Sequence, residues 1–274
     1  MQSEDRRVLA ALRGARREIV RAAEAFAGTF RAGGTCFLFG AGTSGRLAVL
    51  EAAELPPTFG TNPKRVQAII AGGRSAVFRA REGAEDRYED GYERGERARR
   101  GDLVIGISAS SITAFVRGAL DRARERGART VLVTACRSPG IEDVAEILVQ
   151  LDTGPEVVAG STRLKAGTAT KLALNQITTS ALASAGKVFG PWMVDLRAGS
   201  AKLKDRARRI VAMATGSTPR KAQALLARAG GQVKTAIVMG RARVSAAGAR
   251  RRLEKARGDL RTALEVESRG KRSP

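Results

Sequence analysis

Short apolar runs that alternate with helical segments are the feature that most constrains the fold of this chain. Each run has strand length, and most are followed by residues with helical periodicity. Strands that alternate with helices predict a parallel sheet covered on both faces. We therefore expect an α/β fold built on a five-stranded, doubly wound, flavodoxin-like sheet. The runs are residues 36–39, 66–71, 103–107, 130–134 and 147–151, with expected helices at 75–99, 112–126 and 141–145.

Helical periodicity also describes the regions that flank the expected sheet. The helix after the first strand should end at Pro56 and Pro57, because proline disrupts a helix interior. After residue 153 the pattern is helical, with three short helices expected over 205–266. We expect an α/β domain over 1–203 and a helical region with a basic tail over 204–274. The α/β domain would consist of a helix at 4–31, the α/β core at 33–153 and a long helix at 160–186.

The charge balance is basic, but its distribution argues against nucleic acid as the partner. The 274 residues include 49 Lys and Arg against 27 Asp and Glu, a formal net charge of +22. Residues 204–274 hold 19 Lys and Arg and 5 Asp and Glu, so +14 of that charge lies there. Aromatic residues, which stack on bases, are 4% of the chain, and no nucleic-acid-binding motif is present.

Residue types that are rare or missing exclude several kinds of chemistry. The chain has no histidine, which excludes Ser-His-Asp catalysis and His-ligated zinc. Its two cysteines, Cys36 and Cys136, cannot form a zinc cluster or a disulfide framework. No apolar run approaches about 18 residues, and the start MQSEDRR is too polar for a secretory signal. We expect a cytoplasmic protein with no membrane span and no metal.

A glycine-rich loop follows the first expected strand. Its sequence, GAGTSG at 40–45, formally fits the dinucleotide fingerprint G-x-G-x-x-G. The acidic residue that should close the second strand is missing, and Arg74 nearby leaves an NADP site as a minor alternative. Gly42, Thr43 and Ser44 are better suited to one compact phosphate, bound by hydroxyls and by N–H groups at a helix N-terminus. A glycine turn without a ligand is the remaining alternative.

Two further hydroxyl-rich turns precede helices. The first follows the third strand, which neighbours the first strand in a doubly wound sheet, so both turns should meet where the strand order reverses. Each turn alone resembles a helix cap, whereas together they favour a sugar-phosphate site. The residues expected to bind the phosphate in these two turns are Ser108, Ser110, Thr113, Ser161, Thr162 and Lys165.

Two carboxylates are candidates for acid–base catalysis. Glu54 should end the helix that starts at the glycine-rich loop, where the helix dipole favours the protonated form of a carboxyl group. Glu85 lies in the segment REGAED, residues 81–86 beyond the second strand, where Gly83 loosens the backbone. We interpret Glu51, Glu82 and Asp86 as solvated surface residues. From the residues alone, that interpretation holds for Glu54 and Glu85 too.

Several long blocks of the sequence resemble the N-acetylmuramic acid 6-phosphate etherases, a family with a sugar isomerase (SIS) domain. The blocks are GAGTSGRLAVLEAAELPPTFGT, IIAGGRSAVFRAREGAED, GPEVVAGSTRLKAGTATKLALNQITTSAL, GKVFGPWMVDL, ATGSTPRKAQALL and KTAIVM. The resemblance implies cleavage of the D-lactyl ether of N-acetylmuramic acid 6-phosphate to N-acetylglucosamine 6-phosphate and D-lactate. It implies elimination followed by water addition, without a metal or organic cofactor.

The resemblance also assigns roles to the two carboxylates. Glu54 aligns with the acid that protonates the departing lactate, and Glu85 aligns with a second acid–base carboxylate that acts on the C2 proton or the water. The resemblance further implies a homodimer, because SIS domains commonly pair so that neighbouring subunits complete each site. The substrate could come from recycling of peptidoglycan or from imported N-acetylmuramic acid.

The sequence departs from the family pattern at two places. Where the family has S-G-R-T-P, this chain has Ser110-Ser111-Ile112-Thr113-Ala114, which lacks an arginine that could hold an anion. Where the family has A-T-N, the chain has the residues 198–200, Ala-Gly-Ser. These changes keep a second hypothesis open, a non-catalytic sugar-phosphate sensor of the glucokinase regulatory type. Retention of Glu54 and Glu85 favours the enzyme.

Overall fold

The computed structural model describes residues 1–110, 113–136, 140–196 and 201–265. Its residues divide into two compact units, which are described separately. The first comprises Met1–Glu54 and Asn62–Ala181, and the second comprises Leu55–Thr61 and the described residues from Leu182 onward. None of the described helices is both long enough and apolar enough to cross a membrane.

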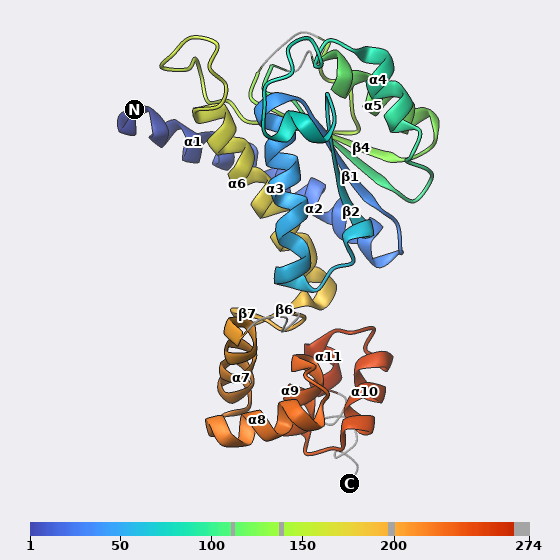
Figure 1. Ribbon diagram of the computed structural model, residues 1–274, viewed down its shortest axis with the longest axis vertical. Coiled ribbons are helices and arrows are strands. Elements are labelled where there is room, and N and C mark those ends of the chain that lie inside the picture. The colour runs from blue at the N-terminus through green and yellow to red at the C-terminus, as the bar shows by residue number, and fades with distance from the viewer. Residues whose placement is uncertain (111–112, 137–139, 197–200, 266–274) are drawn as a thin grey trace. The chain divides into compact units, whose positions relative to one another are not determined.

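The first unit is built around the expected parallel sheet (Figure 1). Its strands run in the order β2-β1-β3-β4-β5, and every neighbouring pair is parallel. Because β1 lies between β2 and β3, the strand order reverses there, as expected for a doubly wound sheet. The strands are β1 (Cys36–Gly40), β2 (Val66–Ile70), β3 (Leu103–Ile107), β4 (Arg129–Thr134) and β5 (Ile147–Gln150).

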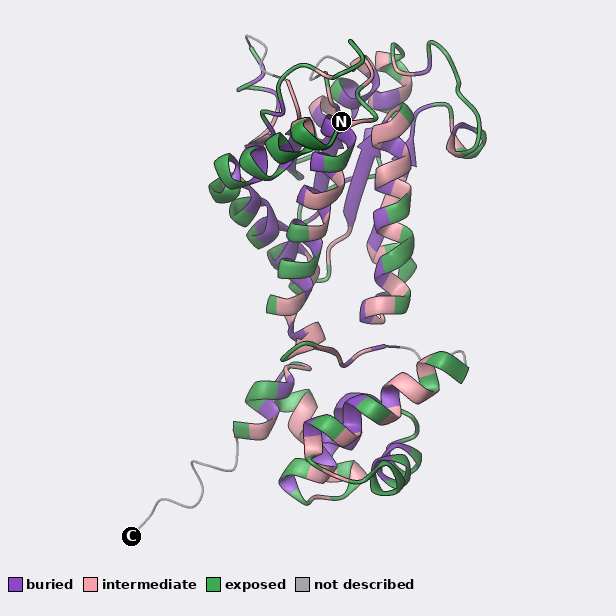
Figure 2. Ribbon diagram, turned by 90° about the vertical axis from the view of Figure 1, so that its left-hand side faces the viewer, coloured by how far each residue is buried: buried purple, intermediate pink, exposed green. Residues whose placement is uncertain are grey.

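Burial explains why these five runs form strands. Every residue of β1 and β3 is buried, and β4 is exposed only at its first residue (Figure 2). Continuous apolar runs are what a parallel sheet covered on both faces requires. The helices of this unit are α1 (Gln2–Gly14), α2 (Arg16–Arg31), α3 (Gly42–Phe59), α4 (Tyr88–Gly95), α5 (Ala114–Glu125) and α6 (Lys165–Leu182). Helix α5 contacts β1, β3 and β4, and α2 contacts β1, β3 and β5.

Several helices differ from the expectation. Residues 4–31 form two helices, because Ala15 leaves helical geometry (φ −87°, ψ 9°) next to the flexible Gly14. Helix α3 does not stop at Pro56 and Pro57 but continues to Phe59. The N–H of Gly60 donates to the carbonyl of Pro56 at 3.0 Å, and the buried Phe59 packs this last turn. Prolines are tolerated there at the cost of two helical hydrogen bonds.

The connection after β2 is mostly irregular. Where a helix was expected at 75–99, the structure has a 3₁₀ turn (Arg74–Val77), a loop and the short helix α4. Gly83, with φ +72°, interrupts any continuous helix in this loop. Residues 141–145 form a turn instead of the expected short helix. The long helix expected at 160–186 covers only Lys165–Leu182 and ends in a π-turn at Ala183–Lys187.

The second unit is helical. It contains a two-stranded antiparallel hairpin, β6 (Val188–Phe189) and β7 (Trp192–Met193), and five helices among its described residues, where three had been expected. The additional breaks fall at Gly230-Gly231 and Arg257-Gly258, four residues with positive φ. The helices are α7 (Ala201–Thr215), α8 (Pro219–Arg228), α9 (Val233–Ala242), α10 (Ala246–Lys255) and α11 (Leu260–Glu265).

Candidate active site

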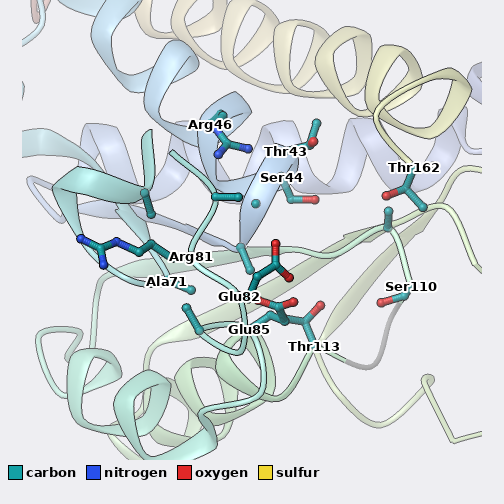
Figure 3. Close-up of a pocket in the computed structure, with 16 residues that line it drawn as sticks. Thr43, Ser44, Arg46, Ala71, Arg81, Glu82, Glu85, Ser110, Thr113 and Thr162 are labelled. Carbon is teal, nitrogen blue, oxygen red and sulfur yellow. The ribbon is translucent and has the colours of Figure 1, made fainter. Parts of the chain in front are cut away.

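A pocket of about 240 Å³ lies in the first unit and is lined by the loops that follow β1, β2 and β3. This is the edge of the sheet where ligands bind in doubly wound folds, beside the reversal of strand order. Figure 3 shows hydroxyl, carboxyl and guanidinium groups gathered around it. The polar lining residues are Thr43, Ser44, Arg46, Arg81, Glu82, Glu85, Ser110, Thr113 and Thr162, and Gly42 adds backbone.

Glycines bring the first loop close to the sheet. Gly42 begins α3 with φ +52°, a conformation that favours glycine. A side chain at Gly45 would place its Cβ only 2.5 Å from Ile70 in β2, so only glycine lets α3 start this close to the strand. The first turn of α3 carries no acidic residue. The free N–H groups at the N-terminus of a helix commonly bind anions. Thr43 and Ser44 add hydroxyls at the same place.

In the second hydroxyl loop, two of the expected residues line the pocket and one is buried behind them. Ser110 and Thr113 line the pocket, whereas Ser108 is buried behind them. The Ser108 Oγ lies 2.6 Å from the Thr113 Oγ1, a hydrogen bond that orients the Thr113 hydroxyl. Of the residues that depart from the family pattern, Ser111, Ile112 and 198–200 lie outside the described residues.

The third loop contributes less than expected. Thr162 lines the pocket, but Ser161 and Lys165 do not. The Lys165 side chain is 1% exposed, and its Nζ donates to a carboxylate oxygen of Glu4 and to the carbonyl of Pro155. The N-terminus of α6 is also occupied, because the Glu156 carboxylate accepts hydrogen bonds from the Lys165 and Ala166 N–H groups. The contacts of Lys165 are therefore structural and do not support a role in binding phosphate.

Glu85 is the candidate catalytic carboxylate that faces the hydroxyl loops. It is half-buried and lines the pocket, and its backbone carbonyl accepts a hydrogen bond of 2.9 Å from the Phe115 N–H at the start of α5. Glu82 also lines this pocket, although nothing in its sequence context distinguishes it from other exposed glutamates. Asp86 is exposed and is not among the lining residues.

Glu54 lies elsewhere in the chain. It is exposed on α3, ten residues beyond Ser44, which is about 15 Å along a helix, and it does not line this pocket. Because α3 continues to Phe59, Glu54 is also not at the helix end, so the argument from the helix dipole does not apply. A single chain thus does not bring Glu54 and Glu85 together around one pocket.

The surface interpretation is wrong for Glu51. This residue is 4% exposed, and its carboxylate accepts hydrogen bonds from the Thr178 Oγ1 at 2.5 Å and from the Lys171 Nζ at 3.3 Å. Both donors are on α6, so the carboxylate of Glu51 joins α3 to α6. Charged groups that are buried need such partners. Glu51 therefore fixes the helix that carries Thr43 and Ser44 at its N-terminus.

Two arginines of the pocket were not expected. The Arg46 Nε donates to the carbonyl of Val77 at 2.9 Å, which holds its guanidinium beside the pocket. The Arg81 Nε lies 3.2 Å from the Ser75 Oγ, and its guanidinium points away from the labelled hydroxyl and carboxyl groups (Figure 3). The position of Arg46, directly after the glycine-rich loop, is the sequence feature that could have indicated its place at the pocket. Arg74, the residue behind the NADP alternative, is exposed and is not among the lining residues.

Cysteine and metal chemistry find little support in the part of the chain that the structure describes. Among these residues, no group of three or more Asp, Glu, Cys or His side chains is placed to hold a metal ion. Cys36 is buried in β1, and this burial raises the pKa of its thiol far above the ordinary range. Its thiol is therefore a packing group and not a nucleophile.

Comparison with known folds defines the class of protein. The family model of the glucokinase regulatory protein N-terminal SIS domain matches residues 18–124. A solved phosphoheptose isomerase from Francisella tularensis aligns with a TM-score of 0.53 and 14% identity, covering 66% of this chain and 93% of that one. Together with the strand order, these matches define the first unit as an SIS-type α/β domain.

Comparison with curated proteins defines the family. The chain is 45% identical over 266 residues to the N-acetylmuramic acid 6-phosphate etherase of Mycolicibacterium smegmatis, covering 96% of this chain and 89% of the relative. It is 47% identical over 268 residues to the protein of that name from Salinibacter ruber, covering 97% and 86%. The chain belongs to the N-acetylmuramic acid 6-phosphate etherase family, which is a family of carbon–oxygen lyases.

Proposed function

We propose that this protein cleaves the D-lactyl ether of N-acetylmuramic acid 6-phosphate and releases N-acetylglucosamine 6-phosphate and D-lactate. The observation that carries the proposal is that Glu85 shares one pocket with the hydroxyl-rich loops after β1 and β3. A sugar phosphate needs hydrogen-bond donors for its phosphate and a proton acceptor near its reacting carbon. Family membership selects the reaction among those that such a site can support.

The phosphate is assigned to the two hydroxyl loops. The N–H groups of the first turn of α3, with Thr43 and Ser44, supply donors from one side, and Ser110 and Thr113 supply them from the loop after β3. Thr162 adds a hydroxyl from a third segment. Each of these groups is neutral, so the loops bind the phosphate through oriented hydrogen bonds.

The reaction then proceeds by elimination and hydration. In the open-chain aldehyde form of the sugar the C2 proton is acidic, and the Glu85 carboxylate removes it. The C3–oxygen bond breaks, its electrons leave with the lactyl oxygen, and a carboxylic acid, assigned to Glu54, protonates that oxygen. Water then adds its hydroxyl to C3 of the unsaturated aldehyde and passes its other proton to the Glu54 carboxylate, while the protonated Glu85 returns a proton to C2, so both carboxyl groups recover their starting states. The chemistry is a net hydrolysis, and two carboxyl groups are sufficient for its proton transfers.

The distance of Glu54 from the pocket supports a homodimeric enzyme. Within one chain Glu54 is about 15 Å along α3 from Ser44 and is exposed to solvent. An exposed carboxylate on a helix surface is available to a second copy of the chain. We therefore assign the Glu54 of one subunit to the pocket that contains the Glu85 of the other. The proposed enzyme is thus a homodimer, and its cytoplasmic location stays a prediction from the sequence.

The direct test is D-lactate release from N-acetylmuramic acid 6-phosphate, measured with a coupled lactate dehydrogenase assay. Glu85→Gln should lower kcat by about 10²-fold or more, because general acid–base catalysis contributes about that much. Asp86→Asn is the matched control, since Asp86 is the adjacent residue, is exposed and does not line the pocket. Equal loss in both variants would contradict the role of Glu85, and wild-type protein that releases no lactate would contradict the proposed reaction.

A mixing experiment tests the shared site. Glu54→Gln and Glu85→Gln should each be inactive, but heterodimers refolded from the two contain one site with both carboxyl groups intact. Activity should therefore reappear in the mixture, at about a quarter of the wild-type rate if subunits pair at random and sites act independently. Activity in neither the single variants nor the mixture would contradict assignment of the two residues to different subunits.

The match to the glucokinase regulatory SIS model favours one other function, a sensor that binds a sugar phosphate without cleaving it. A sensor requires the hydroxyl loops but neither glutamate. Calorimetric titration with N-acetylglucosamine 6-phosphate separates the two hypotheses when it is combined with the lactate assay. Binding without lactate release would favour the sensor.

A further inference from the structure

The pocket contains a guanidinium group that the proposed phosphate site does not use. Arg46 lies one turn into α3, near the positive end of the helix dipole, where a cation is disfavoured unless an anion accompanies it. Among the described residues Arg46 forms no ion pair within 4.0 Å and makes one hydrogen bond, from Nε to the Val77 carbonyl. That bond fixes the plane of the guanidinium and leaves the two terminal amino groups without a partner in the described part of the chain.

Arg46 lies across the pocket from the hydroxyl groups of Ser110 and Thr162. In the view of Figure 3, Arg46 lies on the same side of the pocket as Thr43 and Ser44, Ser110 and Thr162 lie on the opposite side, and Glu82 and Glu85 lie below Ser44. The two carboxylates repel an anionic ligand, so each negative group of the ligand needs its own donors. The hydroxyl loops satisfy one such group, and Arg46 is placed to satisfy another.

The substrate in the proposed function carries two anionic groups. One is the 6-phosphate, and the other is the carboxylate of the lactyl ether on C3. A guanidinium binds a carboxylate through two parallel hydrogen bonds, a geometry for which arginine is better suited than lysine. We propose that Arg46 binds the lactyl carboxylate and thereby distinguishes the substrate from sugar phosphates that lack the lactyl group. This inference rests on the proposed function.

The product provides the control ligand, because N-acetylglucosamine 6-phosphate has the phosphate but no lactyl carboxylate. Arg46→Gln should lower kcat/KM for N-acetylmuramic acid 6-phosphate by about 10- to 100-fold, the value of one charge-assisted pair. Most of the loss should be in KM, because the carboxylate is bound both before and during the reaction. The dissociation constant of N-acetylglucosamine 6-phosphate, measured by calorimetry, should change by less than about threefold, well under that loss.

Two further variants complete the design. Arg46→Lys keeps the positive charge but not the two parallel donors, so it should recover part of the lost kcat/KM. Arg79→Gln removes an exposed arginine from the same loop as Val77, and Arg79 does not line the pocket, so its kinetics should match the wild type. Binding of N-acetylglucosamine 6-phosphate by Arg46→Gln would itself demonstrate that the pocket is folded.

The outcomes distinguish this inference from the proposed function. Equal weakening of both ligands by Arg46→Gln would assign Arg46 to the phosphate and overturn the inference, and so would no change in either. If wild-type protein binds both ligands without releasing lactate, the proposed reaction fails. The role of Arg46 is still tested in that case, by whether Arg46→Gln weakens only the ligand that has a lactyl group.

Discussion

Close packing of α4 against α5 connects the stability of the first unit to the position of Glu85. Gly91 of α4 faces α5, and a Cβ added there would lie 1.9 Å from the carbonyl oxygen of Phe115. Contacts of a real Cβ essentially never fall below 3.0 Å, so Gly91→Ala requires the helices to separate by at least 3.0 − 1.9 = 1.1 Å. The Phe115 N–H donates to the Glu85 carbonyl, so movement of α5 also moves the loop that carries Glu85.

The expected cost follows from two opposing terms. Overpacking costs about 1–3 kcal/mol, and the upper end applies because both groups in the clash belong to backbones. Replacing glycine by alanine inside a helix returns about 1 kcal/mol. We therefore expect Gly91→Ala to destabilise the first unit by about 2 kcal/mol, a factor of about 30 in the unfolding equilibrium. Because a displacement of 1 Å at a catalytic group can cost about 100-fold, kcat should fall by at least about tenfold.

Two measurements check this prediction. Hydrogen exchange of the β3 amides reports the free energy of opening of the first unit, because β3 lies in the interior of its sheet. Lactate release reports the position of Glu85. Gly28→Ala is the matched control, since Gly28 is an exposed helical glycine with no atom within 4 Å of an added Cβ, and it should gain about 1 kcal/mol. If Gly91→Ala were as stable as the wild type, the inferred packing of α4 on α5 would be refuted.

Three other substitutions test buried polar groups. Thr178→Val removes a donor from the buried Glu51 carboxylate and should cost about 1–3 kcal/mol in urea unfolding. The hydrogen bond from Lys165 lowers the pKa of Glu4, so stability from this pair is present above pH 4.5 and is lost on acidification. Lys165→Met should abolish that acid dependence of hydrogen exchange in α1. Burial lowers the pKa of Lys234 in the folded state, so the unfolded state binds more protons in the window between that lowered pKa and pH 10.5. Thermal stability of the helical unit should therefore rise with pH toward 10.5, except in Lys234→Met.

The sheet could be predicted from the sequence because its strands are buried on both faces. Such strands appear as uninterrupted apolar runs, and the five expected runs correspond to β1–β5 to within one residue at each end. The order of the strands followed from their alternation with helices, since doubly wound folds offer few alternatives. The hydroxyl loops were found for the same reason, because each follows a strand that the pattern had already located.

Helix ends were less predictable, because tertiary contacts outweigh local propensity. Pro56 and Pro57 are ordinary stop signals, yet Leu55 and Phe59 are 2% and 5% exposed, and their burial retains another turn of α3. No local signal shows that these two side chains are buried. The loop that carries Glu82 and Glu85 lies in a stretch expected to be helical, but Gly83 adopts φ +72° there and the path is irregular.

The candidate site shows the same limit at the level of single side chains. Glu51 and Glu54 are three residues apart on α3, with similar neighbours in sequence, yet one is buried against α6 and the other is exposed. Periodicity indicates that a helix has a buried face but cannot say which partner covers it, so it gave no reason to pair Glu51 with Thr178. The exposure of Glu54 is compatible with the proposed acid role only if a second copy of the chain supplies the pocket. The proposed role of Glu54 needs that second copy, because the residue is solvent-exposed in one chain, so the proposal predicts activity that depends on the oligomeric state. Specific activity that stays constant on dilution to a demonstrated monomer would remove the reason for placing Glu54 in a shared site.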